Sequence, residues 1–307
     1  MNTAPGGSFA VSRPGPALAW WLALRPWSFT ISLAPVLAGT SLAGLHGHPA
    51  QIALVAAALV ASIFIHAGTN LQNDVGDFRR GADLAGRIGP PRATTEGWLT
   101  ARQVQTAAAL CFAAALIPGS YLVMKGGWPI VAVGAVSIVA GAAYTAGPRP
   151  IAYSGWGEVF VIVFFGLVAV CGMYYLHAGS AGVAPIVAGA AVGLLAAAVL
   201  VVNNLRDMDS DRRIGKNTLA VRCGRRFTLI EYALLLLAPF ALDIVLALHE
   251  RTAELVLPLL LLPWATRLAL QVRRAPTGAW LNAALGSTAK LGLAFAFLLC
   301  LGASLAR

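Results

Sequence analysis

Long apolar runs constrain this chain more than any other feature. Nine stretches hold the roughly 20 apolar residues that a membrane-spanning helix needs. They lie at residues 17–45, 50–72, 103–123, 126–146, 155–178, 183–205, 227–249, 253–272 and 283–306. The runs lack the period-two alternation of a membrane β-strand, and 58% of all residues are hydrophobic whereas only 11% are charged. The sequence therefore predicts an all-α polytopic membrane protein, a bundle of nine transmembrane helices, and excludes a soluble domain.

The runs also suggest how the chain is divided. Residues 1–16 are rich in Gly, Pro and Ser and are predicted to form a disordered tail without a cleavable signal peptide. Residues 17–307 are predicted to form one transmembrane domain. The first run contains Arg25-Pro26, so we expect it to begin as a kinked or interfacial helix.

Two polar clusters interrupt the apolar sequence, each at the end of a run. They span residues 70–83 and 204–216 and hold six of the chain's 12 acidic residues. A shift of 134 residues superposes the pairs Asn70/Asn204, Leu71/Leu205, Asp77/Asp211, Arg79/Arg213 and Gly81/Gly215. This repeat predicts two halves at 17–146 and 155–272, followed by a ninth helix at 283–306. Because four predicted spans separate the clusters, both should emerge on the same membrane face.

The basic residues are distributed unevenly among the predicted loops. Most Lys and Arg lie in the loops after the second, fourth, sixth and eighth runs, whereas the loops after the odd-numbered runs hold only Lys125 and Arg251. The positive-inside rule then places the N-terminus and both clusters in the cytoplasm. The net charge of +10 thus reflects topology in a lipid bilayer and gives no reason to expect a nucleic-acid partner. The 4 cysteines are scattered and show no metal-binding or disulfide pattern.

Helical spacing turns each cluster into a polar stripe, since residues three and four apart share a face. The stripes consist of Asn70, Asn73, Asp74 and Asp77, and of Asn203, Asn204, Asp207 and Asp211. Carboxylate and amide oxygens without His or Cys favour Mg²⁺, which proteins hold with few carboxylates plus substrate phosphates. Two such ions with flanking bases suit a diphosphate. The alternative for either cluster is a solvated helix end, and Asp83 and Asp209 are expected to have no role.

Other residues are predicted to surround the same site. Bases in the adjoining loops are candidates for phosphate binding, namely Arg92, Arg149, Lys216 and Arg222. Tyr144 lies at the membrane end of a run, where tyrosine is also common as interface decoration. His66 is expected to be a packed polar residue. Two positions are possible for the Lys290 side chain, which can snorkel to the interface or face the cavity.

At these residues the chain resembles the UbiA superfamily of intramembrane aromatic prenyltransferases. The resemblance rests on Asn73-Asp74-Val-Gly-Asp77, an Asn-Asp-x-x-Asp motif after the second helix, and on Asp207-Met-Asp-Ser-Asp211, an Asp-x-x-x-Asp motif after the sixth. The stretches "NDVGDFRRGADLAGRIGPPR", "YTAGPRPIAYSGWGE", "NNLRDMDSDRRIGKNTLAVRCG" and "LRPWSFTISLAPVLAGT" resemble the naphthoate, or menaquinone, branch. Gly81 stands where hydroxybenzoate-type members usually carry a further Asp.

The resemblance implies Mg²⁺-dependent transfer of a polyprenyl group from an allylic diphosphate to an aromatic acid. In the naphthoate branch the acceptor is 1,4-dihydroxy-2-naphthoate, which loses CO₂ and gives demethylmenaquinone, in the bacterial inner membrane with the site facing the cytoplasm. The implied ligands of two Mg²⁺ ions are Asn73, Asp77, Asp207 and Asp211. The implied catalytic residues are these three aspartates with Asp74 and Tyr144, and the implied substrate-binding residues are Asn70, Asn73, Asn204, Lys216, Arg92, Arg149 and Arg222.

Two alternatives stay open. The acceptor can be another aromatic compound, such as 4-hydroxybenzoate, homogentisate, a quinolone or a chlorophyllide. A secondary transporter also has internal repeats and intramembrane acids. Its coupling acids would lie near the bilayer midplane, whereas Asp74 and Asp207 here follow long apolar runs and so lie at the rim.

Overall fold

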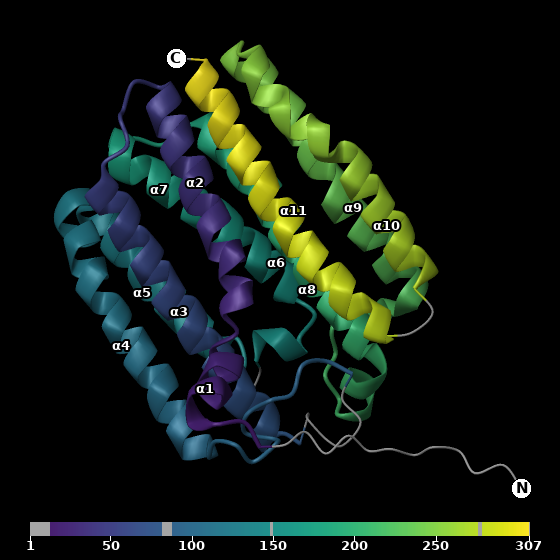
Figure 1. The fold of residues 1–307 in the computed structure, drawn as a ribbon. Helices are drawn as coiled ribbons and strands as arrows, with labels where there is room; N and C mark the ends of the chain where they lie inside the picture. The colour runs from purple at the N-terminus through teal and green to yellow at the C-terminus, as the bar shows by residue number, and fades with distance from the viewer. Residues whose placement is uncertain (1–12, 82–87, 148–149, 276–277, 307) are drawn as a thin grey trace, which may run out of the picture.

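The computed structural model describes residues 13–81, 88–147, 150–275 and 278–306. Within these ranges the chain is all-helical, and no strand occurs. Figure 1 shows the long helices lying side by side as a bundle. The predicted all-α class is confirmed, whereas most of the predicted N-terminal tail lies outside the described residues.

Eleven α-helices and four shorter helical segments make up the described chain. The α-helices are α1 (Pro16–Leu24), α2 (Thr30–Leu45), α3 (Ile52–Arg79), α4 (Ala101–Gly126), α5 (Trp128–Ala143), α6 (Gly157–Val161), α7 (Ala169–Ala178), α8 (Val183–Arg213), α9 (Leu219–Glu250), α10 (Leu262–Arg274) and α11 (Gly278–Leu305). The other segments are the 3₁₀ helices η1 (Pro26–Phe29), η2 (Ile151–Tyr153) and η4 (Ala253–Leu261), and the π-helix η3 (Ile162–Val168).

Eight helical stretches in the described chain, one of them broken near its start, are long and apolar enough to cross a membrane. They match eight of the nine predicted runs, so the chain is a multi-span membrane protein. The run at 126–146 becomes α5, which has 16 residues and is about 24 Å long at 1.5 Å per residue. That is shorter than a hydrocarbon core of about 30 Å, and a count of nine spans stays a prediction.

The first run is broken where the sequence predicts a kink. α1 ends at Leu24, and Arg25 takes a left-handed backbone conformation with φ of 54°. Pro26 then begins η1, which leads into α2. α1 packs against α3 and lies near the lower end of the bundle in Figure 1. The break brings the Arg25 side chain to the end of the bundle where α3 also ends.

The sequence repeat has a structural counterpart. A shift of 134 residues carries Ile52–Arg79 onto 186–213, which is α8 apart from its first three residues. Both helices end at an arginine and are followed by a glycine with positive φ, 67° at Gly81 and 71° at Gly215. α3 packs along α4, and α8 packs along α9. The two polar clusters therefore end equivalent helices, as the repeat predicts.

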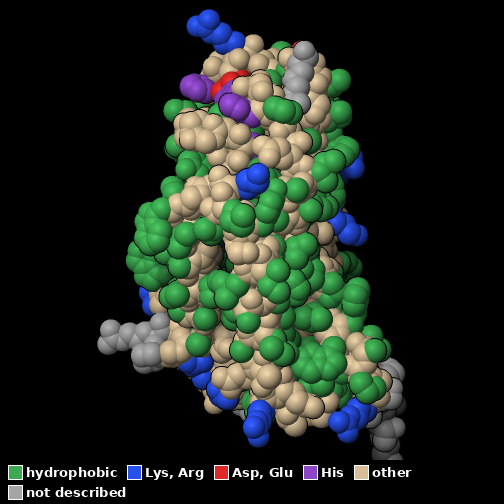
Figure 2. All heavy atoms as spheres, turned by 90° about the vertical axis from the view of Figure 1, so that its left-hand side faces the viewer, with side chains coloured by type: hydrophobic (Ala, Val, Ile, Leu, Met, Phe, Trp, Pro, Cys, Tyr) green, Lys and Arg blue, Asp and Glu red, His purple; other side chains and the backbone are tan. Residues whose placement is uncertain are grey.

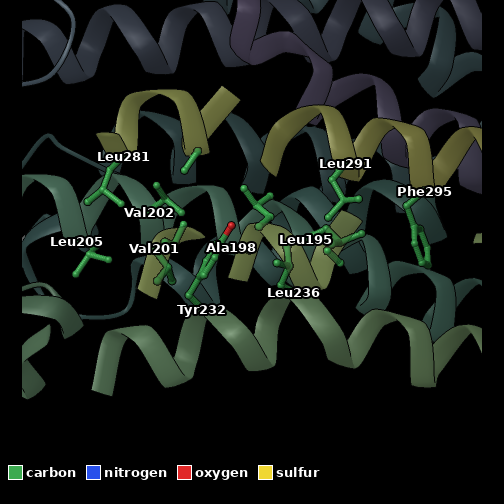
Figure 3. Close-up of a cluster of buried hydrophobic side chains, with 14 of the residues drawn as sticks. Leu195, Ala198, Val201, Val202, Leu205, Tyr232, Leu236, Leu281, Leu291 and Phe295 are labelled. Carbon is green, nitrogen blue, oxygen red and sulfur yellow. The ribbon is translucent and has the colours of Figure 1, made fainter. Parts of the chain in front are cut away.

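Helix α8 lies at the centre of the bundle. Its most apolar window is 72% buried, whereas the other seven candidate spans range from 17% to 56%. Figure 3 shows side chains from α8 packed against residues of α9 and α11, and the labelled residues are Leu195, Ala198, Val201, Val202, Leu205, Tyr232, Leu236, Leu281, Leu291 and Phe295. Because lipid tails are as apolar as leucine, close van der Waals packing holds such helices together. The polar stripe at the end of α8 is thus anchored by the best-packed helix.

The surface agrees with a membrane environment. Figure 2 shows hydrophobic side chains over the middle of one face and a group of Lys and Arg at its lower end. That end corresponds to the lower end of Figure 1, where α3 ends. The basic end and the polar clusters thus lie on the same side of the bundle.

Candidate active site

The first polar stripe lies on the last three turns of α3. Asn70, Asp74 and Asp77 are buried, with relative exposures of 7%, 0% and 4%. Asn70 Nδ2 donates to the Leu24 carbonyl and to Ser28 Oγ, both at 3.1 Å. This pair of bonds joins α3 to the break between α1 and α2. Helical spacing thus gives the predicted stripe, and the stripe holds the chain around Arg25 in place.

Within this stripe, Asp74 and Asn73 are positioned by threonines from outside α3. The Thr94 hydroxyl donates to Asp74 Oδ1, and Thr145 Oγ1 donates to Asn73 Oδ1 at 2.9 Å. Thr145 can approach because α3 carries Gly76 at the contact, where a Cβ atom would lie 3.1 Å from the threonine. Among the described residues, Asp74 Oδ2 is buried without a hydrogen-bond partner.

Asp77 is the most heavily contacted member of the first stripe. Arg92 Nη2 donates to Asp77 Oδ2 at 2.6 Å, and both side chains are nearly buried, at 7% and 5% exposure. Tyr153 Oη donates to Asp77 Oδ1 at 2.8 Å. Burial and the negative charge of Asp77 both raise the pKa of the Tyr153 phenol, so it stays protonated and keeps donating.

The second stripe lies on the last three turns of α8. Arg206 Nε and Nη2 donate to the two oxygens of Asp207, at 2.8 and 2.7 Å. Lys216 Nζ lies 3.5 Å from Asp211 Oδ1. Asn204 Nδ2 donates to Glu158 Oε1 at 2.8 Å, which ties α8 to the start of α6. Each carboxylate of the second motif therefore has a basic neighbour.

The two stripes meet at a small polar cavity of about 90 Å³. Asn73 and Asp77 line it from α3, Asn203 and Asn204 from α8, and the predicted residues Arg92, Tyr144 and Lys216 from the adjoining segments. Asp77 and Asp207 also lie within electrostatic reach of Asp211. The structure thus brings the two halves of the repeat to one place, as expected from the even number of spans between them.

A second, larger cavity adjoins the polar one. It measures about 440 Å³ and is lined mainly by apolar and aromatic side chains, among them Trp27, Phe160 and Phe165. Arg25, Asn73, Tyr144, Leu200 and Asn203 line both cavities. The Tyr144 ring lies 5.1 Å from that of Phe160, centroid to centroid. A polar chamber therefore shares a wall with an apolar one, and Tyr144 stands at that wall.

Not every predicted residue reaches these cavities. Asp74, Asp207 and Asp211 are buried at the same end of the bundle but line neither cavity. Arg222 is exposed and lies against Gly155, whose Cβ would be 3.3 Å from the guanidinium carbon. Asn70 lines the larger cavity but not the polar one.

Arg149, a predicted phosphate-binding residue, and Asp83, which was expected to have no role, both lie outside the described residues. Asp209, which was expected to have no role, is 86% exposed and lies 3.8 Å from Arg212. His66 is buried, with Ser32 Oγ 2.8 Å from Nδ1 and Ser28 Oγ 3.2 Å from Nε2, so it is a packed polar residue that also lines the larger cavity.

The structure adds residues that the sequence did not assign to the site. Arg25 lines both cavities, and the signal for it was the Arg-Pro break, which we interpreted only as a kink. Glu158 lines the polar cavity; the sequence placed its segment near the site but gave the residue no role. Arg206 gave a weaker signal, as a base directly before the second acidic motif. In the structure it donates hydrogen bonds to Asp207 and, at 2.9 Å, to Asn282 Oδ1.

The side chains of the two motifs fit a hard divalent cation. The predicted ligands offer only carboxylate and amide oxygens, and Asp211 Oδ2 is buried without a hydrogen-bond partner in the described chain. No three His, Cys, Asp or Glu side chains of the described ranges form a ready metal site, since Arg92, Arg206 and Lys216 lie against the carboxylates. Mg²⁺ takes much of its coordination from water and substrate phosphates, so a complete protein cage is not required.

Comparisons with known proteins agree with this geometry. Residues 32–279 match the model of the UbiA prenyltransferase family. The 1,4-dihydroxy-2-naphthoate octaprenyltransferase of Mycobacterium tuberculosis is 38% identical over 84% of this chain and 87% of its own length. That of Escherichia coli is 39% identical over 67% and 68%. The human UbiA prenyltransferase domain-containing protein 1 is 34% identical over 82% and 74%.

Solved structures show the same fold. A UbiA homolog from Archaeoglobus fulgidus bound to DMAPP and Mg²⁺ superposes with a TM-score of 0.67, at 18% identity over 92% of this chain and 99% of that one. A homolog from Aeropyrum pernix gives a TM-score of 0.62 at 17% identity, over 92% and 98%. With the family model covering most of its length, the chain belongs to the UbiA prenyltransferase family and is a membrane transferase.

Proposed function

We propose that the chain transfers a polyprenyl group from an allylic diphosphate to 1,4-dihydroxy-2-naphthoate, with loss of CO₂, and so makes demethylmenaquinone. The observation that carries the proposal is the pair of cavities, a polar one between two acidic motifs and an apolar one that shares its wall. The naphthoate octaprenyltransferases among its relatives support this acceptor.

The polar cavity suits the diphosphate. Arg25, Arg92 and Lys216 line it and bring positive charge to phosphate oxygens. Asn73, Asp77, Asp207 and Asp211 would hold two Mg²⁺ ions, which when bound neutralise the charge of the departing diphosphate. In this arrangement Tyr153 keeps Asp77 oriented through its hydrogen bond.

The apolar cavity suits the hydrocarbon and the ring. When the bond between C1 of the prenyl group and the diphosphate oxygen breaks, positive charge develops at C1 near the shared wall. The face of Tyr144 can stabilise that charge, and the aromatic lining excludes the water that would capture it. The ring attacks C1 to form a carbon–carbon bond, and the carboxylate leaves as CO₂ while its electron pair returns to the ring.

The orientation in the membrane is part of the proposal. The group of Lys and Arg at one end of the bundle supports a topology in which both acidic motifs face the cytoplasm of a bacterial inner membrane. Reporters fused after Arg80 and Arg213 should then read cytoplasmic, whereas one near Arg251 should read periplasmic. A periplasmic reading at either motif would contradict this topology.

The acceptor is tested by a panel of aromatic compounds. Purified protein is incubated with Mg²⁺, a polyprenyl diphosphate and one acceptor: the naphthoate, 4-hydroxybenzoate or homogentisate. The masses of the products are then measured by mass spectrometry. The naphthoate should be prenylated fastest, because a cavity shaped for two fused rings misplaces the attacking carbon of a single ring. Equal or faster turnover of 4-hydroxybenzoate would refute the naphthoate assignment.

A further inference from the structure

Lys290 is a charged residue about halfway along the last span, and its exposed side chain lines the wall of the apolar cavity. It lies ten residues after Trp280, where the last apolar span begins, which places its backbone about 15 Å along the helix. That is halfway through a hydrocarbon core of about 30 Å. An amine at this depth is costly and, where it occurs, usually serves a ligand or a partner.

The start of α11 lies at the end of the bundle that holds the acidic motifs. Asn282 accepts a hydrogen bond from Arg206 at 2.9 Å, so the first turn of α11 lies beside the second acidic motif. In a helix the Cα–Cβ bond leans towards the N-terminus. The Lys290 side chain is therefore expected to lean from mid-depth towards the polar cavity.

Lys290 lines the apolar cavity without a protein partner. Three cations line the apolar cavity, Arg25, Arg206 and Lys290. Arg206 is paired with Asp207, and Arg25 also interacts with another part of the protein. Lys290 makes no hydrogen bond or ion pair with any residue in the described part of the chain. Its charge is thus available to a ligand in the cavity.

The rest of the lining indicates what that ligand is. Three aromatic side chains line the cavity, Tyr144, Phe160 and Phe165, and the small α11 residues Gly286 and Ala289 line it together with Lys290. A hydrocarbon tail gains nothing from an amine, and the diphosphate is expected at the polar cavity. A flat ring that carries a carboxylate matches both the aromatic lining and the charge.

We propose that Lys290 binds the carboxylate of the aromatic acceptor and makes the enzyme select acids over neutral rings, an inference that rests on the proposed function. A charge-assisted hydrogen bond in an apolar cavity is strong. After prenyl transfer the carboxylate leaves as CO₂, so the product loses its bond to Lys290. Loss of that bond favours release of the neutral product into the bilayer.

The test compares Lys290→Met and Lys290→Arg with a matched control, Lys125→Met. Lys125 is exposed, lies 5.8 Å from the Tyr121 ring and lines neither cavity. We expect Lys290→Met to raise KM for the naphthoate at least tenfold, the effect of losing one hydrogen bond to a charged group. KM for the prenyl diphosphate should stay within twofold, and the Arg variant should keep most of the affinity.

Direct binding separates this inference from the proposed function. The naphthoate and its 2-carboxamide are titrated into each variant by calorimetry without prenyl diphosphate. Wild type should prefer the acid, and Lys290→Met should lose that preference while binding the carboxamide as before. The inference is overturned if Lys290→Met keeps the preference for the acid, or if only the diphosphate KM rises.

Two further outcomes are also decisive. If wild type never prenylates the naphthoate, the proposed function fails, yet the titration still decides whether Lys290 selects carboxylates. If Lys290→Met does not fold, as judged by gel filtration in detergent, Lys290→Gln takes its place and must show the same loss of acid preference.

Discussion

Gly166 offers the sharpest test of how the site is positioned. A Cβ atom at Gly166 would lie 2.3 Å from the Gly189 carbonyl oxygen and 2.5 Å from the Gly193 Cα atom. Ordinary contacts between carbon atoms are about 3.5–4.0 Å, and both neighbours are backbone. Gly166→Ala therefore forces η3 and α8 apart by about 1 Å. We expect this overpacking to cost about 1–3 kcal/mol of stability.

The displacement should also reach the site. Phe165 of η3 lines the apolar cavity and Asn203 of α8 lines both, and a shift of about 1 Å at such groups can lower the rate roughly a hundredfold. Thermal unfolding in detergent and prenyl transfer are measured for Gly166→Ala and for the control Gly172→Ala, which has open space within 4 Å. The control should match wild type. If Gly166→Ala melts and turns over like the control, the packing described for η3 and α8 is wrong.

Substitutions at three further residues probe separate parts of the site. Arg92→Met should raise KM for the prenyl diphosphate about tenfold or more, since a hydrogen bond to a charged group contributes about 1.5–3 kcal/mol, and steady-state kinetics with an unchanged KM would refute this role. Tyr153→Phe should lower kcat/KM about tenfold, because a hydrogen bond to a charged group contributes about 1.5–3 kcal/mol and Asp77 would lose the one that Tyr153 donates. Because burial raises the pKa of Tyr153, the wild-type pH–rate profile should show no loss from this phenol up to pH 10. Tyr144→Leu should lower kcat roughly 30-fold, because a desolvated cation–π contact is worth about 2 kcal/mol. Tyr144→Phe should keep most of the wild-type kcat. Equal rates for the two variants would show that the ring face does not stabilise the developing charge.

The sequence predicted the arrangement that depends on local pattern. Apolar length predicts spans, and helical spacing predicts the stripe from Asn70 to Asp77. The offset of 134 residues predicted that α3 and α8 are equivalent. None of these inferences needed a contact between distant residues.

What the sequence missed depends on such contacts. Glu158 joins the site through Asn204, 46 positions away, and Arg25 joins it because α1 ends in a left-handed residue. The short α5 and the π-helix η3 were also missed, because hydropathy measures the apolar content of a run but not its exact helical geometry. Pattern alone could not place these residues, since their position is set by packing between helices.

The central claim is that two acidic motifs from equivalent helices form one diphosphate site. The most direct measurement is calorimetric binding of an unreactive thiolodiphosphate analogue of the prenyl substrate, with Mg²⁺ or with excess chelator. Wild type should bind only with Mg²⁺, and Asp77→Asn and Asp211→Asn, one from each motif, should each lose binding while staying folded. Binding that survives the chelator, or that survives either substitution unchanged, would contradict a site shared by α3 and α8.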